Sequence, residues 1–170
     1  ADVLLLNNPT ICLYGSYVLD DFRFGWSDID ILVLTEKPIS EQQADKLVCL
    51  RQSMIAAEPC NTIYRCFEGG MLTLDAFKHH VPTKVVYWGT NGQRITDSYH
   101  FDAFCMKELF DYGQLIYGKD IREQLTLPSF EDLKANIQFH YETIRKYASS
   151  SGRSIYSFGW LLDIARGIYT

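Results

Sequence analysis

The residues best suited to chemistry in this 170-residue chain are two aspartates that follow a glycine–serine pair. Gly15 and Ser16 end a short apolar stretch, and after eleven further residues Asp28 and Asp30 begin another. Side chains alternate between the two faces of a strand, so these aspartates project to the same side, about 6.5 to 7 Å apart. The two carboxylates are therefore directed at one point.

A divalent cation bound together with phosphate is the chemistry that this arrangement favours. Two like charges side by side cost free energy unless a cation lies between them, and Mg²⁺ takes carboxylate oxygens while keeping positions for phosphate oxygens. A turn at Gly15 and Ser16 offers a phosphate close backbone approach, N–H groups and a hydroxyl. An Asp-x-Asp pair alone more often marks an exposed strand end, but the preceding Gly-Ser and the apolar residues 31–34 favour the metal–phosphate site.

The elements around these residues form a mixed α/β pattern up to about residue 100. A helical spacing of apolar residues follows Ser40, the expected N-cap, and stops before Pro59. Gly69-Gly70 interrupts a β-rich stretch, which is either one bulged strand or a hairpin. After residue 100 helices dominate, and because the last still runs at Thr170 we expect a second module that continues further. The predicted strands are 11–16, 28–34, 62–67, 71–77 and 85–88, and the predicted helices are 40–58, 102–117, 129–148 and 155–170.

Composition argues against several classes of protein. The apolar runs are far shorter than the roughly 18 to 20 residues that cross a bilayer, so we expect no membrane span. A net charge of −5 argues against broad affinity for a nucleic-acid backbone and suits a cationic small substrate. The five cysteines form no C-x-x-C pair, which indicates reduced thiols in a cytoplasm rather than a disulfide framework or a zinc ribbon.

The segments 14–16 and 27–33 resemble the G-S…D-x-D signature of the polymerase-β-like nucleotidyltransferase superfamily. The segments 88–94, 117–120 and 160–170 are similar to bacterial aminoglycoside adenylyltransferases of the streptomycin/spectinomycin type. The resemblance implies an α+β fold, in which a polymerase-β-like nucleotidyltransferase domain, built as a mixed sheet with flanking helices, precedes a helical domain.

The resemblance also implies domain limits and a reaction. We expect the nucleotidyltransferase domain over residues 1–100 and the start of the C-terminal helical domain over 101–170. The reaction would transfer a nucleotidyl group, AMP from ATP, to a hydroxyl of an aminoglycoside-like small molecule and release pyrophosphate, as in antibiotic resistance. Asp28 and Asp30 would hold Mg²⁺, with two ions expected, and the Gly15-Ser16 turn would position the phosphates.

The family further implies a third carboxylate that acts as a general base. Glu68 occupies the matching position ahead of Asp75, its rival on the same predicted hairpin. Trp88 and Asp163 are candidates for the acceptor pocket, the first as an apolar wall and the second as a partner for an ammonium group. Packing in the core for Trp88 and an ion pair with Arg166 for Asp163 are the structural alternatives.

Two other functions fit the same motif. An antitoxin-type nucleotidyltransferase would use the same fold to modify a protein partner, and a degenerate member would bind a nucleotide without transferring it. The intact Asp28 and Asp30 argue against the degenerate member. An acidic surface around the cleft would favour a small cationic acceptor over a protein.

Overall fold

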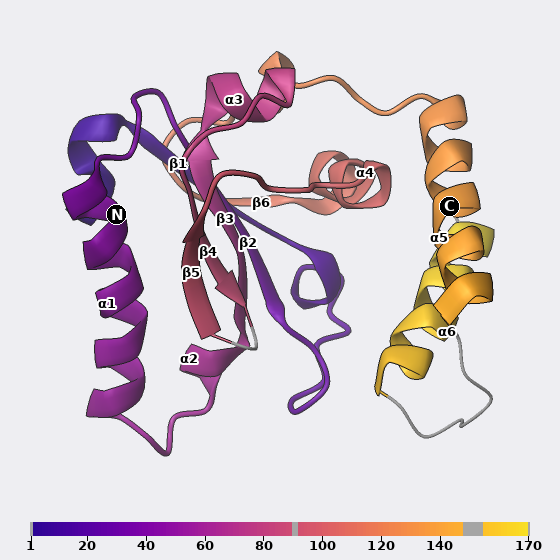
Figure 1. Ribbon diagram of the computed structural model, residues 1–170, viewed down its shortest axis with the longest axis horizontal. Coiled ribbons are helices and arrows are strands. Elements are labelled where there is room, and N and C mark those ends of the chain that lie inside the picture. The colour runs from indigo at the N-terminus through magenta and orange to yellow at the C-terminus, as the bar shows by residue number, and fades with distance from the viewer. Residues whose placement is uncertain (1, 90–91, 148–154, 170) are drawn as a thin grey trace. The chain divides into compact units, whose positions relative to one another are not determined.

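A six-stranded mixed sheet forms the centre of the fold, in the strand order β5-β4-β3-β2-β1-β6 (Figure 1). Strand β1 is antiparallel to both β2 and β6, β2 is parallel to β3, and β3, β4 and β5 are successively antiparallel. The strands are β1 (Pro9–Tyr14), β2 (Ile29–Thr35), β3 (Phe67–Thr73), β4 (Val85–Gly89), β5 (Gly92–Thr96) and β6 (Gln114–Tyr117). This mixed sheet with flanking helices is the predicted α+β fold.

The computed structural model describes residues 2–89, 92–147 and 155–169, which divide into two units. The first unit holds residues 1–101 and 105–127, and the second holds residues 102–104 and 128–170. Residues 105–127 thus pack with the sheet, whereas the predicted boundary at residue 100 assigns them to the helical domain. The physical reason is that β6 pairs with β1.

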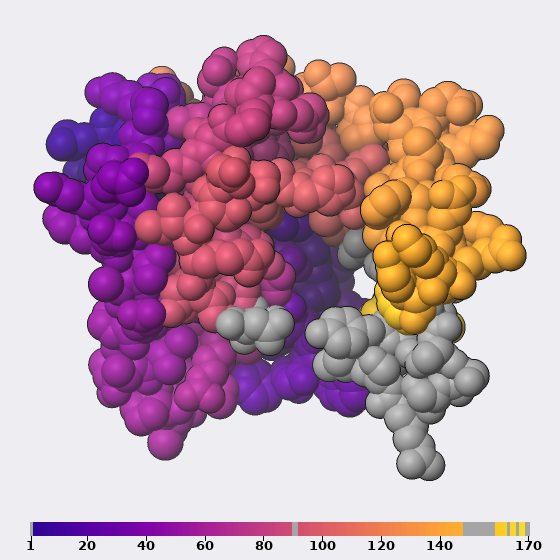
Figure 2. Space-filling model, in the orientation of Figure 1, coloured from indigo at the N-terminus to yellow at the C-terminus, as the bar shows by residue number. Residues whose placement is uncertain are grey.

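One helix lies against each face of the sheet. Helix α1 (Glu41–Ala57) places its buried residues at positions 44, 47 and 51 against one face, and its outer side forms the left flank of the first unit in Figure 2. Helix α4 (Ala103–Tyr112) covers the other face with Leu109. Because β2 is buried on both faces, its residues from Ile31 to Leu34 are uniformly apolar. The short helices are η1 (Asp2–Asn7), η2 (Gly15–Tyr17), α2 (Ile63–Cys66), α3 (Leu74–His79) and η3 (Arg122–Gln124).

The second unit consists mainly of helices α5 (Phe130–Tyr147) and α6 (Ile155–Tyr169), which pack on each other. A Cβ atom added at Gly167 would lie 3.1 Å from Cγ1 of Ile137, so the two backbones approach closely there. The predicted cap of α5 is confirmed, because Asp132 N–H donates to Ser129 Oγ at 3.2 Å and Ser129 N–H donates back to Asp132 Oδ2 at 2.8 Å. No helix in the described ranges is both long and apolar enough to span a membrane.

The start of α1 is also confirmed, and it gives a first testable prediction. Gln43 N–H donates to Ser40 Oγ at 3.2 Å, and Ser40 N–H donates to Gln43 Oε1 at 3.0 Å, which together form a capping box. We expect Ser40→Ala to lower the free energy of unfolding by about 1 kcal/mol, because one helix N–H loses its acceptor. Urea unfolding measures this loss. Ser53→Ala, on the exposed side of the same helix, is the control, and an equal loss in both variants would contradict the prediction.

Two parts of the sequence prediction need correction. Residues 62–67 are not a strand: α2 occupies most of them, and a single strand, β3, then runs straight through Gly69-Gly70 before α3 begins. Gly69 has φ 151°, and a Cβ there would lie 1.7 Å from the carbonyl oxygen of Ile31, so the glycine lets the two backbones pair. The predicted helix 102–117 ends at Tyr112, and its last residues form β6.

Candidate active site

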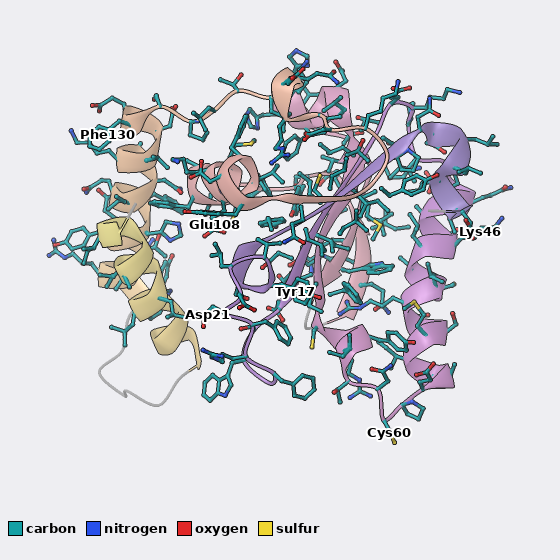
Figure 3. All side chains as sticks on the ribbon, turned by 180° about the vertical axis from the view of Figure 1, so that it is seen from behind. Tyr17, Asp21, Lys46, Cys60, Glu108 and Phe130 are labelled. Carbon is teal, nitrogen blue, oxygen red and sulfur yellow. The ribbon has the colours of Figure 1, made fainter. Side chains whose placement is uncertain are left out.

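The glycine turn and the three predicted carboxylates, Asp28, Asp30 and Glu68, lie at one end of the strands of the sheet. Strand β1 runs antiparallel to β2, whereas β3 runs parallel to it. The last residues of β1 and the first residues of β2 and β3 therefore lie at the same end of the strands. Tyr14 is paired with Asp30, and Asp30 is paired with Glu68 on the next strand. In Figure 3, Tyr17 and Asp21 mark the turn and the loop that follow β1 toward this lower end of the sheet.

The turn after β1 brings backbone directly against a carboxylate. Gly15 has φ 71°, and a Cβ atom there would lie only 2.1 Å from Oδ2 of Asp30. Any other residue would therefore be strained and would displace the carboxylate. Ser16 follows in the same turn, half-buried, and its carbonyl accepts a hydrogen bond from Asp21 N–H at 3.0 Å. The turn is thus shaped to hold Asp30 and to present Ser16 beside it.

Asp28 lies immediately before β2 and is coupled to Glu68. Burial is the largest cause of the raised pKa of Asp28. Together with the negative charge of Glu68 and a hydrogen bond between the two carboxyls, and against the opposing charge of Arg51, it brings this pKa to about 7. The Asp28 carboxyl therefore holds its proton to a higher pH than an ordinary aspartate. Asp28 and Glu68 therefore lie within hydrogen-bonding distance of each other beside Asp30.

The donor set fits a divalent cation that is bound together with phosphate. Within the residues that the structure describes, no three His, Cys, Asp or Glu side chains converge to hold an ion by themselves. Mg²⁺ does not need such a cage, because it is commonly bound by one or two carboxylates and completes its shell with water and phosphate oxygens. Asp28 and Asp30 at the Gly15 turn match that requirement.

Tyr87 contacts the carboxyl group of Glu68 and was not among the residues predicted from sequence. Its hydroxyl donates a hydrogen bond to Oε1 of Glu68, and its ring lies under the guanidinium of Arg94, with Cζ 4.4 Å from the ring centroid. Burial raises the pKa of the Tyr87 phenol well above its ordinary value, so it stays a donor. Side chains alternate along a strand, so within the predicted strand 85–88 the side chain of Tyr87 points to the other face of the sheet from those of the residues on either side of it. This alternation can be read from the sequence and could have identified Tyr87 as a candidate.

Arg51 is the second functional candidate that sequence reasoning missed. Only 2 % of it is exposed, and it donates hydrogen bonds to the carbonyls of Tyr64, Arg65, Gly89 and Gly92 at 3.4, 2.9, 2.6 and 3.1 Å. Its positive charge interacts with the carboxyl groups of Asp28 and Glu68 and opposes the rise in the pKa of Asp28. A signal was present in the sequence, because a charged residue lies on the buried stripe of α1 at positions 44, 47 and 51.

The structure brings neither Trp88, a candidate for the acceptor pocket, nor Asp75, the rival to Glu68, to this end of the strands. Trp88 is 7 % exposed and belongs to the core under α1, on the face of the sheet opposite to Glu68, so it does not form a wall of an acceptor pocket here. Asp75 is not on a hairpin: it lies exposed in the first turn of α3, beyond the far end of β3, and pairs with His79 at 3.2 Å. The side chain of Asp163 lies outside the described residues.

The pKa of Asp28 leads to a second prediction. The pKa of Asp28 rises from 3.8 in an ordinary environment to about 7 in the folded protein. Between these two pH values the folded state therefore keeps a proton on Asp28 that the unfolded state has released. The stability of the metal-free chain is therefore expected to fall as the pH rises from about 4 to about 7, and to level off above. Asp28→Asn removes this slope and is expected to be more stable than wild type at pH 8. Urea unfolding at pH 5 and pH 8 with a chelator measures both effects.

The control for that experiment is Asp45→Asn, which changes an exposed carboxylate on the outer side of α1. We expect it to retain the wild-type dependence on pH. If Asp28→Asn keeps the same slope as wild type, the proton is not bound at Asp28 and the prediction fails.

Comparison with known proteins shows what the part of the chain around this site is similar to. Residues 5–63, about a third of the chain, match the family model described as a nucleotidyltransferase domain. That range contains Gly15, Ser16, Asp28 and Asp30. Over these residues the chain is similar to a nucleotidyltransferase domain, and the mixed sheet with the carboxylates at its strand ends agrees with that class.

A solved structure supports the same fold. Spectinomycin adenyltransferase AAD(9) from Enterococcus faecialis, determined with ATP and spectinomycin, aligns with a TM-score of 0.58 at 19% identity. The alignment covers 88% of this chain and 64% of that protein, so the chain spans less than two thirds of its length. At this identity the likeness is one of fold alone.

A second structure, a toxin–antitoxin with AMP-PNP, aligns over 85% of this chain and 86% of its own at 14% identity. Its TM-score of 0.36 is too low to support an argument from its fold. No curated protein sequence matches the chain significantly.

Proposed function

We propose that the chain carries the catalytic centre for Mg²⁺-dependent transfer of AMP from ATP to a hydroxyl of an aminoglycoside-like small molecule. The observation that carries this proposal is the contact of the Gly15 backbone with the Asp30 carboxylate, beside the coupled Asp28 and Glu68. A phosphate-binding turn, a pair of metal-binding carboxylates and a further carboxylate are the groups that such a transfer needs.

Each residue has a defined part in the reaction. The backbone of Gly15 and the hydroxyl of Ser16 hold the phosphates, and Asp28 and Asp30 would hold Mg²⁺. When bound, Mg²⁺ would supply positive charge that offsets the charge developing on the phosphate oxygens. Glu68 accepts the proton of the acceptor hydroxyl, whose oxygen forms a bond to the α-phosphorus. The bond between the α- and β-phosphates breaks, and its electron pair leaves with pyrophosphate.

Two observations support the choice of acceptor and compartment. The net charge of −5 favours a cationic acceptor over an anionic one, and a protein of the same fold was solved with ATP and spectinomycin. None of the five cysteines forms a disulfide, which is typical of a reducing cytoplasm. The reaction would place the protein among the enzymes of bacterial antibiotic resistance.

The experiment that tests this function combines the chain with Mg²⁺, α-labelled ATP and a panel of aminoglycosides beside candidate protein acceptors. Label on a small molecule with release of pyrophosphate, lost in Asp30→Asn, is the expected result. Label on a protein would instead establish the antitoxin-type reaction. ATP binding without transfer would identify a nucleotide-binding module, and absence of ATP binding with Mg²⁺ present would overturn the proposal.

A further inference from the structure

Tyr87 lies in a row of groups that crosses five strands near the acidic edge. The row runs from Gly15 after β1 through Asp30 on β2 and Glu68 on β3 to Tyr87 on β4 and Arg94 on β5. Tyr87 is paired with Gly70 of β3, two residues after Glu68, so the two side chains project from the same face. The strand order therefore puts the phosphate-binding turn on one side of Glu68 and Tyr87 on the other.

The position of the Tyr87 hydroxyl is determined by the packing of its ring. The guanidinium of Arg94, its cross-strand partner, lies 4.4 Å from the ring centroid, and the ring of Tyr99 lies 6.3 Å away at a tilt. Tyr99 itself is held over Gly70, where an added Cβ would come within 2.8 Å of its ring. A ring that packs against these two neighbours has little freedom to turn, so its hydroxyl stays directed at Oε1 of Glu68.

We propose that Tyr87 is a positioning residue for Glu68: its hydroxyl holds one carboxylate oxygen so that the group faces the acceptor hydroxyl. The inference rests on the proposed function, in which Glu68 accepts the acceptor's proton. A carboxylate on a flexible glutamate side chain samples several orientations, and a fixed donor selects one of them. The phenol does not compete for the proton, because burial keeps it in its neutral form. A residue that only packs would not direct its single polar atom at the base.

The test is Tyr87→Phe, which removes the hydroxyl and keeps the ring against Arg94 and Tyr99. With spectinomycin and streptomycin as acceptor probes, we expect kcat to fall roughly 10- to 100-fold, the range for groups that orient a reactive side chain. The KM for ATP and the unfolding midpoint are expected to stay unchanged. The matched control is Tyr99→Phe, whose hydroxyl faces that of Tyr14 at 3.5 Å, and its kcat is expected to stay within about twofold of wild type.

A double-mutant cycle separates positioning from an independent effect. In a Glu68→Gln background, Tyr87→Phe is expected to cause no further loss of kcat, because the group that it positions is already inactive. A further loss in that background, or full kcat in the single variant, would overturn the inference while leaving the proposed function intact. A wild-type chain that transfers no label would remove the proposed function, and the role of Tyr87 with it.

Discussion

Asp30→Asn is expected to reduce nucleotidyl transfer by about three orders of magnitude while leaving the fold intact. The side chain keeps its shape, so it still fits against Gly15, where the carboxylate is in near-contact with the backbone of the turn. It loses the negative charge, however, and an amide is a much weaker ligand for Mg²⁺ than a carboxylate. The charge that develops on the phosphates is then poorly stabilised.

The measurement is the rate of label transfer from α-labelled ATP, with thermal unfolding recorded on the same preparations. Asp45→Asn, which removes an exposed carboxylate from α1, serves as the control for the change in net charge. If Asp30→Asn transfers label at the wild-type rate, Asp30 does not belong to the catalytic centre and the proposed function loses its main support.

Arg51→Met is expected to lower the free energy of unfolding by about 3 to 5 kcal/mol. The guanidinium joins two segments that are distant in sequence, the α2 region through Tyr64 and Arg65 and the β4–β5 hairpin through Gly89 and Gly92. Methionine fills much of the same volume but donates no hydrogen bond. The carbonyls near this buried site are left without a partner, which costs more than the hydrogen bonds themselves contribute.

Urea unfolding of Arg51→Met against Arg65→Met measures this effect, because Arg65 is exposed and carries the same charge. We expect the second variant to lose no more than about 0.5 kcal/mol. Equal losses in the two variants would mean that the charge, rather than the buried hydrogen bonds, determines the stability of this region.

The parts of the structure that could be predicted from sequence are those encoded by neighbouring residues. The Gly15-Ser16 turn, the two aspartates and the Ser40 cap each depend on a few consecutive side chains, and the structure places them as the local pattern indicates. The assignment of Glu68 over Asp75 as the third carboxylate agrees with the strand pairing, in which Glu68 lies beside Asp30. The catalytic role of these residues stays a prediction.

The parts that could not be predicted depend on pairing between distant segments. Strand β6 is short, exposed and follows directly on α4, so its residues continue an apolar helical pattern and only their hydrogen bonds to β1 reveal a strand. The contact of Tyr87 with Glu68 follows from the strand order, which no local pattern specifies. Trp88 was a candidate for the acceptor pocket, with packing in the core as the alternative, and alternation along β4 directs it into the core on the face opposite to Glu68.

The position of β6 also bears on how the chain folds as it is synthesised. Strand β1 becomes an inner strand only when Tyr117 has paired with Ile11, more than a hundred residues after β1 has emerged from the ribosome. Until then β1 presents an open edge, which invites pairing with another nascent chain. The exposure is prolonged by the same long sequence separation that makes such sheets slow to form. The elongation rate of residues 105–117 therefore bears on the yield of folded protein as well as on its timing.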